Sequence, residues 1–256
     1  MIRALYTAVS GLITQEAKQN VITNNLANVS TTGFKSNNLV VSKFNDVLIQ
    51  NSDKLVNGKN VKNVIGSISQ GSQIDEVTTD FSDGTMQSTS LDTDFAISGK
   101  GFFTVTRNNQ DYYSKDGHFH VDNQGYLAND NGDRVKGTNV NTNMTDNIFV
   151  GSGKLSSDGS GQISIDGKHN YNFNIASFDN LKSLKDIGDN LYTGTNPKQA
   201  TGITVNQGSL EASNVDVMTE IVNMMTVMRT YETNQKLVQY LDQTLAKTVN
   251  EVGAVR

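Results

Sequence analysis

The side chains best suited to metal or proton-transfer chemistry are three histidines, His118, His120 and His169. His118 and His120 are two positions apart, so on a strand both point to the same face of the sheet. Two histidines at this spacing can begin a metal site, but the sequence marks no third ligand for one. We therefore expect exposed strand histidines, with no metal site, no cofactor and no catalytic residue.

Two glycine-containing segments resemble ligand-binding loops only in part. Gly99-Lys100-Gly101 begins like a phosphate-binding loop, but a strand-like run follows where such a loop needs the start of a helix. Asn129, Asn131 and Gly132 echo a calcium loop, but Leu127 stands where the first carboxylate ligand is required. Both segments are interpreted as turns, and the sequence indicates a protein that is not an enzyme.

Composition excludes further kinds of site and partner. The 256-residue chain has a formal net charge of -5, so it lacks the basic footprint of a nucleic-acid-binding protein. It contains no cysteine, which excludes disulfides, thiolate ligands and cysteine nucleophiles. It has no apolar run long enough for membrane insertion, and its first residues lack the apolar core of a cleaved secretory signal.

The elements that position the rest of the chain begin with an N-terminal amphipathic helix. Apolar residues recur every three to five positions from Ile2 to about Val29, as on one stripe of a helix. The stripe ends in the turn-rich segment 28–35, where Gly33 can adopt a positive φ.

The C-terminal stretch has the same character. Apolar residues at near-heptad spacing predict a helix from Val215 to about Val252. Ser213 and Asp216 before it fit the Ser-x-x-Asp form of a capping box. Both apolar stripes are wide, so pairing the two helices leaves apolar surface that needs other copies or another partner.

The middle of the chain predicts antiparallel strands. Short alternating runs are separated by turn dipeptides such as Asp166-Gly167, and Asp116-Gly117 between two such runs is the strongest short hairpin signal. The predicted fold is α+β, with long terminal helices pairing as a coiled coil and an inserted antiparallel all-β domain. An alternative is a single α+β unit in which the helices fold back over the β domain. The expected segments are an assembly helix and motif at 1–35, an extended linker at 36–66, the β-rich domain at 67–208 and a second assembly helix at 209–256.

Blocks of sequence in all three parts resemble one known family. The N-terminal block is Asn24-Asn25-Leu26-Ala27-Asn28-Val29-Ser30-Thr31-Thr32-Gly33-Phe34-Lys35, and the middle adds Asp94-Phe95-Ala96-Ile97-Ser98-Gly99-Lys100-Gly101-Phe102-Phe103. The C-terminal part gives Gly208-Ser209-Leu210-Glu211-Ala212-Ser213-Asn214-Val215-Asp216 and Arg229-Thr230-Tyr231-Glu232-Thr233-Asn234-Gln235-Lys236. In type and order these blocks are similar to those of the bacterial flagellar rod and hook family. The chain length resembles the basal-body rod proteins more than the larger hook protein.

The resemblance implies a structural axial subunit of the flagellar basal-body rod, without enzymatic activity. It implies export through the flagellar type III apparatus, and terminal helices that form the inner tube of a polymer transmitting torque from motor to hook. The implied partners are other copies of the chain, other rod and hook axial proteins, the export apparatus and the surrounding ring proteins. The implied location is the basal body in the cell envelope.

The residues expected to carry assembly lie in the helices and in the motif. The motif residues include Asn25 to Lys35, where side-chain amides can bind exposed backbone, Gly33 permits a turn and Phe34 anchors it. The full expected set is Leu5, Val9, Leu12, Asn25, Leu26, Ala27, Asn28, Thr31, Gly33, Phe34, Lys35, Asn214, Val215, Ile221, Met225, Met228, Tyr231, Glu232, Asn234, Leu241 and Leu245. The alternative function is a secreted β-domain protein that binds or acts on glycans, supported only by an Asn-rich strand surface and weakened by the absence of tryptophan.

Overall fold

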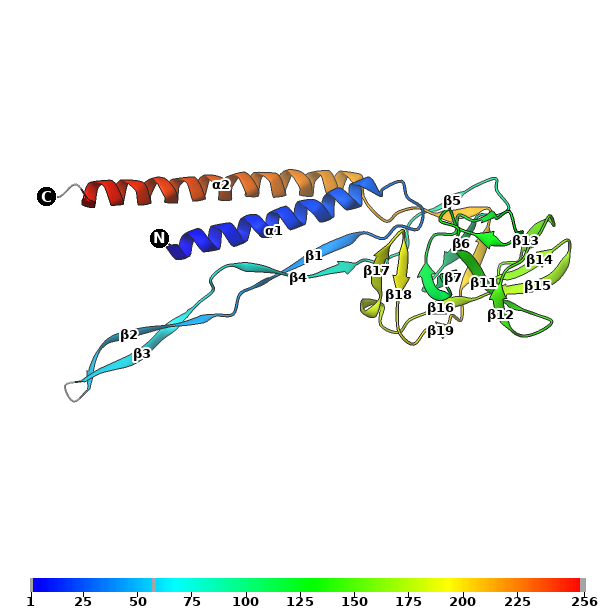
Figure 1. Ribbon diagram of the computed structural model, residues 1–256, viewed down its shortest axis with the longest axis horizontal. Helices are drawn as coiled ribbons and strands as arrows, with labels where there is room; N and C mark the ends of the chain where they lie inside the picture. Colours follow the sequence, from blue (N-terminus) through cyan, green and yellow to red (C-terminus); the bar gives the residue numbers. More distant parts are fainter. Residues whose placement is uncertain (1, 57–58, 254–256) are drawn as a thin grey trace. The chain divides into compact units, whose positions relative to one another are not determined.

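A computed structural model describes residues 2–56 and 59–253 (Figure 1). Its contacts divide the chain into two units. The helical unit contains the described residues of 1–26, 37–78 and 217–256, and the β unit contains 27–36 and 79–216. The motif segment 27–36 belongs to the β unit and not to the helical unit.

The helical unit contains two long helices and four strands. Their bounds are α1 Ile2–Ala27, β1 Asn37–Lys43, β2 Val47–Val56, β3 Lys59–Ile68, β4 Ser72–Thr79 and α2 Val217–Gly253. The range expected to be a linker, 36–66, therefore holds β1, β2 and most of β3. Its polar composition does not prevent strand formation, since the bonds that join β2 to β3 come from the backbone.

Helix α2 begins two residues later than the sequence pattern predicts. Ser213 is therefore not its cap, and the Ser213 hydroxyl instead accepts a hydrogen bond from the Val215 amide, at 3.2 Å. The prediction of a capping box at Ser213 is wrong. Glu220 is the acidic residue in the first turn of α2, where a negative charge is favoured by the unpaired amides of the helix start.

The two helices contact each other in an antiparallel arrangement within their unit. Near the end of α1, the Asn25 side-chain amide lies 3.4 Å from Glu220 Oε1. A Cβ atom added to Gly11 would lie 3.0 Å from Asn234 Nδ2. Both contacts keep one register, because Asn25 and Gly11 are 14 residues apart, as are Glu220 and Asn234.

Strands β2 and β3 form a long antiparallel hairpin with two register shifts. Several of its aliphatic side chains are exposed, among them Leu48, Ile49, Val64 and Ile65. Strands β1 and β4 form a separate two-stranded sheet.

The β unit contains the remaining strands, which pair antiparallel. Their bounds are β5 Met86–Ser88, β6 Phe95–Ser98, β7 Phe102–Arg107, β8 Gln110–Ser114, β9 His120–Val121, β10 Leu127–Ala128, β11 Arg134–Asn139, β12 Thr145–Asn147, β13 Leu155–Ser157, β14 Gln162–Ile165, β15 Lys168–Phe173, β16 Ile175–Ser177, β17 Lys185–Gly188, β18 Leu191–Thr193, β19 Lys198–Gln199, β20 Thr204–Gln207 and β21 Ser209–Glu211, with a short 3-10 helix at Leu181–Ser183. The main sheet has the strand order β13-β14-β15-β11-β7-β8-β18-β17, with β9, β10, β12, β16 and β19 joined to its sides.

The turn dipeptides have mixed outcomes. Asp166-Gly167 joins β14 to β15 with both residues at positive φ, as a tight hairpin requires. Asp116-Gly117 forms no hairpin, since β8 pairs with β7 and β18 while β9 pairs with β10, so that prediction is wrong. The tight turn after β7 is instead formed by Asn108 and Asn109, both at positive φ.

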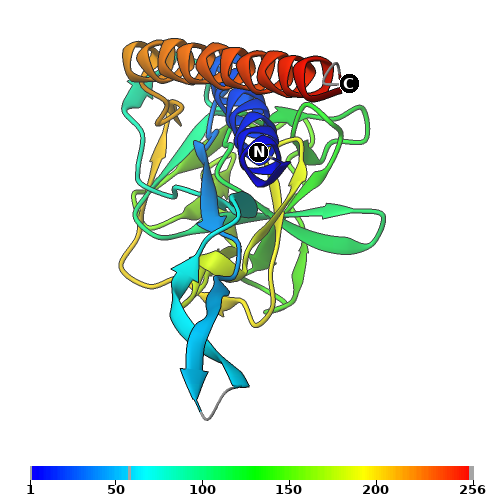
Figure 2. The same cartoon turned by 90° about the vertical axis from the view of Figure 1, so that its left-hand side faces the viewer.

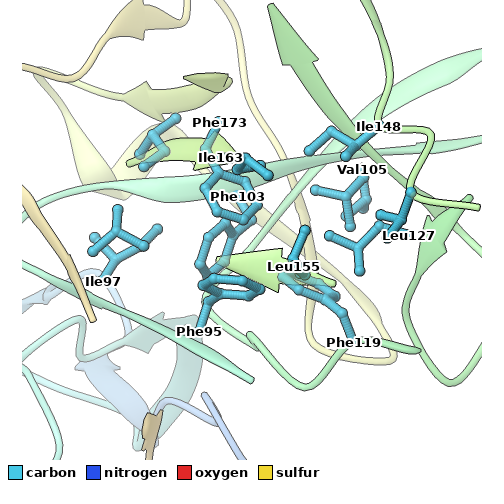
Figure 3. Packing of buried hydrophobic residues seen from close by; sticks show 14 of the residues in the cluster. Phe95, Ile97, Phe103, Val105, Phe119, Leu127, Ile148, Leu155, Ile163 and Phe173 are labelled. Carbon is cyan, nitrogen blue, oxygen red and sulfur yellow. The ribbon is translucent and has the colours of Figure 1, made fainter. Parts of the chain in front are cut away.

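The inserted domain has a large hydrophobic core, as the alternating pattern predicts, and a second, smaller cluster around Phe102 and Tyr192. Phe95, Phe103, Phe119 and Phe173 meet at its centre, and three of their ring pairs are edge-to-face with centroids 4.9–5.4 Å apart (Figure 3). Aliphatic residues such as Leu127 surround them. Within 2–56 and 59–253, neither helix is apolar enough over a sufficient length to span a membrane.

Candidate functional site

Asn25 closes the N-terminal motif segment at its helical end. Its side chain is buried and forms a double hydrogen bond with the backbone of Asn37, whose amide donates to Asn25 Oδ1 and whose carbonyl accepts from Asn25 Nδ2, both at 2.9 Å. One side chain thus joins the last turn of α1 to the first residue of β1, which are 12 positions apart.

Past the end of α1 the chain makes a turn that depends on a glycine. The Thr31 hydroxyl donates to Asn28 Oδ1 at 3.2 Å, and Gly33 follows with φ at +66°. A Cβ atom on Gly33 would lie 2.5 Å from the Asp116 amide nitrogen, so only glycine fits without moving backbone. The Gly33 amide donates to the carbonyl of Glu211 at 2.8 Å.

Lys35 and Glu211 form a fully buried ion pair in the β unit. Lys35 Nζ lies 2.6 Å from Glu211 Oε1 and also donates to the Ser82 carbonyl at 2.7 Å. The Gly84 amide donates to the same carboxylate oxygen at 2.9 Å. Burying two charges is favourable only when their polar atoms find partners. These backbone groups provide them for Lys35 Nζ and Glu211 Oε1, whereas the buried Glu211 Oε2 accepts no hydrogen bond.

A second lysine faces the same carboxylate. Lys115 is buried, donates to the Gly99 carbonyl at 2.8 Å and places its Nζ 3.6 Å from Glu211 Oε2. Burial lowers the pKa of Lys115, Glu211 opposes that change, and the charge of Lys35 adds to it. We call Gly33, Lys35, Lys115 and Glu211 the motif cluster.

Asp116, next to Lys115, fixes the turn from the other side. Its Oδ1 accepts from the Thr32 hydroxyl at 2.7 Å and from the His118 amide at 3.0 Å. Burial raises the pKa of this carboxyl group, and those two hydrogen bonds oppose the rise. Lys115, Asp116 and Glu211 are absent from the site residues expected from the sequence, since nothing local marks which charges of the β domain meet the motif.

Asn214, in the C-terminal block, binds backbone groups through its side-chain amide, as Asn25 does in the N-terminal block. Its Oδ1 accepts from the Ser36 amide at 2.8 Å, and its Nδ2 donates to the Asp80 carbonyl at 2.9 Å and lies 3.1 Å from the Ser82 hydroxyl oxygen. Val215, the next residue, is buried. The motif segment, residues 80–82 and the chain before α2 are therefore joined through one amide.

The expected assembly residues divide into an inward and an outward group. Phe34 is buried, and the partly buried residues are Leu5, Leu12, Leu26, Asn28, Thr31, Tyr231, Asn234, Leu241 and Leu245. The exposed ones are Val9, Ala27, Ile221, Met225, Met228 and Glu232. The outward group contains most of the apolar residues expected on the first half of α2.

The histidine pair has a structural setting. His118 Nδ1 lies 2.8 Å from Asp94 Oδ1, a buried carboxylate that also accepts from the Thr89 hydroxyl at its other oxygen. Burial lowers the pKa of His118, but the hydrogen bond and charge of Asp94, together with the nearby carboxylates of Asp130 and Asp116, raise it overall. Among the residues that the structure describes, no three histidine or carboxylate side chains are grouped to hold a metal ion.

Three family models of flagellar rod and hook proteins match the N-terminal, middle and C-terminal parts of the chain in turn. The family model "Flagella basal body rod protein" matches residues 5–35, the D1 domain of flagellar hook protein FlgE/F/G matches 96–177, and the C-terminal model of flagellar basal body rod FlgEFG protein matches 206–251. The chain is 32% identical to the flagellar basal-body rod protein FlgG of Borreliella burgdorferi, over 96% of this chain and 97% of that protein. It belongs to the flagellar basal-body rod family.

Further relatives match the whole chain at a similar level. FlgG of Bacillus subtilis is 31% identical over 98% of this chain and 99% of that protein, and FlgF of Caulobacter vibrioides is 30% identical over the full length of both. As a member of this family the chain is a structural protein of the flagellar basal body and not an enzyme.

Proposed function

We propose that this rod subunit self-assembles through its terminal helices into a tubular shaft that transmits torque from motor to hook. In that shaft α1 and α2 pair as a coiled coil and form the inner wall. The proposal includes export through the flagellar type III apparatus, contact with other rod and hook proteins, and contact with surrounding rings.

One observation carries the assembly proposal: α2 has two apolar faces. The face toward α1 contains the buried Val227 and the half-buried Leu241, together with the polar Asn234, which lies against Gly11. A second set, which we call the outer stripe, is exposed and consists of Met218, Ile221, Val222, Met225 and Met228. An exposed apolar face on a helix that already has one partner indicates a further partner, and a helical polymer provides one for every copy.

The antiparallel register supports the coiled-coil pairing. Contacts at Asn25–Glu220 and Gly11–Asn234 keep a constant offset over 14 residues, two heptads. On α1, the exposed Tyr6, Val9 and Ile13 are spaced by three and four residues and extend the available apolar surface. We propose that the whole set of expected helix residues, from Leu5 to Leu245, acts in assembly in these two ways.

The motif residues have a different role in this proposal. Asn25 and Asn214 fix the backbone at the end of the segment, at Asn37 and Ser36, while Gly33, Phe34 and Lys35 are held inside the β unit. We propose that they give the segment after α1 one fixed path, so that every copy presents its helices in the same way.

The test is a pair of charged substitutions in the outer stripe. I221D with M225D in the full chain places two carboxylates on the proposed contact face, and polymerisation measured by sedimentation and electron microscopy is expected to be lost. Q243D, at an exposed polar position on the same helix, is the control and is expected to polymerise like the unmodified chain. Normal polymers from I221D/M225D would contradict assembly through this stripe.

A further inference from the structure

The helical unit contains a pocket in which one buried carboxylate oxygen has no hydrogen-bond donor from the same copy. It has a volume of about 290 Å³ and lies between α1, the start of β1 and the first turns of α2. Its lining includes Lys18, Ile22, Asn25, Leu39, Glu220 and Val227. All of these residues belong to the helical unit, so the pocket is defined by that unit alone.

Glu220 has an unsatisfied carboxylate oxygen in this pocket. Its Oε1 accepts one long hydrogen bond from Asn25 Nδ2, at 3.4 Å, whereas its Oε2 is buried and has no hydrogen-bond partner. A buried carboxylate oxygen without a donor is costly, because it loses water and gains nothing in return. Lys18, the cation in the lining, forms no ion pair with it in the described chain. Among the described residues, no positively charged side chain therefore pairs with this carboxylate.

Arg229 has the chemistry and the position to supply that donor. It is exposed, it forms no ion pair within the described residues, and it stands four positions after Met225 on the side of α2 that carries the outer stripe. A guanidinium group is planar, always charged and more weakly hydrated than an ammonium group, which suits a partly apolar pocket. Its methylene stem can lie along the methionines beside it.

Arg229 cannot reach Glu220 of its own chain. The two residues are nine positions apart, which at about 1.5 Å per residue separates them by roughly 13 Å along the axis. At 3.6 residues per turn they also point in opposite directions around the helix. An ion pair between them is possible only between two copies.

We propose that Glu220 of one copy binds Arg229 of a second copy, so that a carboxylate pocket in the helix pair receives a basic side chain from the outer stripe of its neighbour. This inference rests on the proposed self-assembly and names one contact that specifies it. Its effect is on register, since only one axial offset of the two copies aligns a charge with a pocket.

The test exchanges the two charges in the full-length chain. E220R and R229E are each expected to raise the concentration needed for polymerisation at least tenfold, because each places like charges at every contact. The double variant E220R/R229E restores opposite charges at every contact and is expected to polymerise within about threefold of the unmodified chain. K236E makes the same charge change seven residues beyond Arg229 and is the matched control, expected to stay within threefold.

A cross-linking measurement tests directly whether residues 220 and 229 of two copies lie close together, and it does not depend on the double variant restoring polymerisation. The chain has no cysteine, so E220C and R229C, made in separate chains and mixed, carry the only thiols present. A short bismaleimide is expected to join the two chains in polymers, and E220C mixed with K236C to give at least tenfold less product. Near-ultraviolet circular dichroism of each monomer shows that the β unit remains folded.

The outcomes separate the two proposals. If the unmodified chain polymerises and E220R does as well, or if the double variant stays defective and no E220C–R229C product forms, the inference is overturned while self-assembly stands. If the unmodified chain does not polymerise under any condition, self-assembly fails and the inference fails with it.

Discussion

The two units treat apolar side chains in opposite ways. The β unit encloses its aromatic residues, with Phe95 and Phe103 inaccessible to solvent. The helical unit leaves Tyr6, Met218 and Val222 more than half exposed, although both helices are longer than the usual globular helix. Figure 2 shows the hairpin of the same unit, in which β2 and β3 twist around each other as paired strands. The first pattern is that of a domain complete within one chain, and the second is that of a surface completed by other chains.

This comparison predicts very different resistance to proteolysis, the largest effect we expect. In dilute monomer, α1 and α2 should be cut at least 100-fold faster than the β unit, because helices with one covered face open readily. The resistant material should contain residues 79–216. It should also contain the segment 27–36, which remains bound to them non-covalently after cleavage within 37–78. Mass spectrometry of the purified resistant complex checks both statements. Equal resistance of helices and β unit would remove the distinction between the units.

Removing one charge of the motif cluster should destabilise the β unit strongly. E211Q leaves Lys35 buried without a carboxylate and Lys115 with only the exposed carboxylate of Asp83, at 3.6 Å, and we expect a loss of about 3–5 kcal/mol in the free energy of unfolding. K35M leaves Glu211 facing Lys115 and should cost less. Urea denaturation followed by tyrosine fluorescence measures both, and a smaller loss for E211Q than for K35M would contradict the role given to Lys115.

The turn at Gly33 offers a test with a built-in control. G33A introduces a Cβ atom against the backbone of residues 115 and 116, and we expect a loss of about 3 kcal/mol, or roughly 6–12 °C in the melting temperature of the β unit. Gly132 also has a positive φ but nothing within 4 Å of its would-be Cβ, so G132A should cost only about 1 kcal/mol. Calorimetry on both variants separates the clash from the backbone strain, and equal losses would show that no clash exists.

The smallest effect expected is a pH dependence at His118. Its pKa is raised in the folded chain, so its bond to Asp94 contributes stability that is fully present below the unfolded value of about 6.5 and is lost as pH rises through the folded value. The contribution should stay below about 1 kcal/mol because the imidazole is partly solvated. The stability difference between the unmodified chain and H118N should shrink between pH 6 and pH 8, and a difference that grows would reverse the sign.

Periodicity and turn chemistry account for what the sequence predicted correctly. The two helices and the inserted antiparallel domain follow from local repeats that the structure keeps. Asp166-Gly167 forms its predicted turn because neighbouring strands agree with it. Asp116-Gly117 does not form a hairpin turn. Here the backbone at Gly117 packs directly against the Phe95 carbonyl, since a Cβ atom on Gly117 would lie 1.6 Å from that oxygen, and the chain turns away from β8 instead of folding back along it.

The partner of Lys35 could not be predicted for a different reason. Glu211 was part of a block that resembles the family, but the sequence gives no signal that a charge at 211 meets one at 35 and another at 115. Such a contact depends on the whole arrangement of strands between them. In contrast, Asn25 and Asn37 are near neighbours in sequence, and an amide beside a turn is a usual partner for exposed backbone.

The separation of Lys35 and Glu211 also affects the order of folding. The two residues are 176 positions apart, so their contact closes one of the longest loops in the chain. Contacts of this kind form late, because the chain loses the entropy of closing the loop before it gains the interaction. A chain that emerges N-terminus first therefore has its motif segment open until more than four-fifths of its length is available. The buried ion pair can form only after the last strands of the β unit are available to fold. The path of the segment after α1 therefore becomes fixed late in folding.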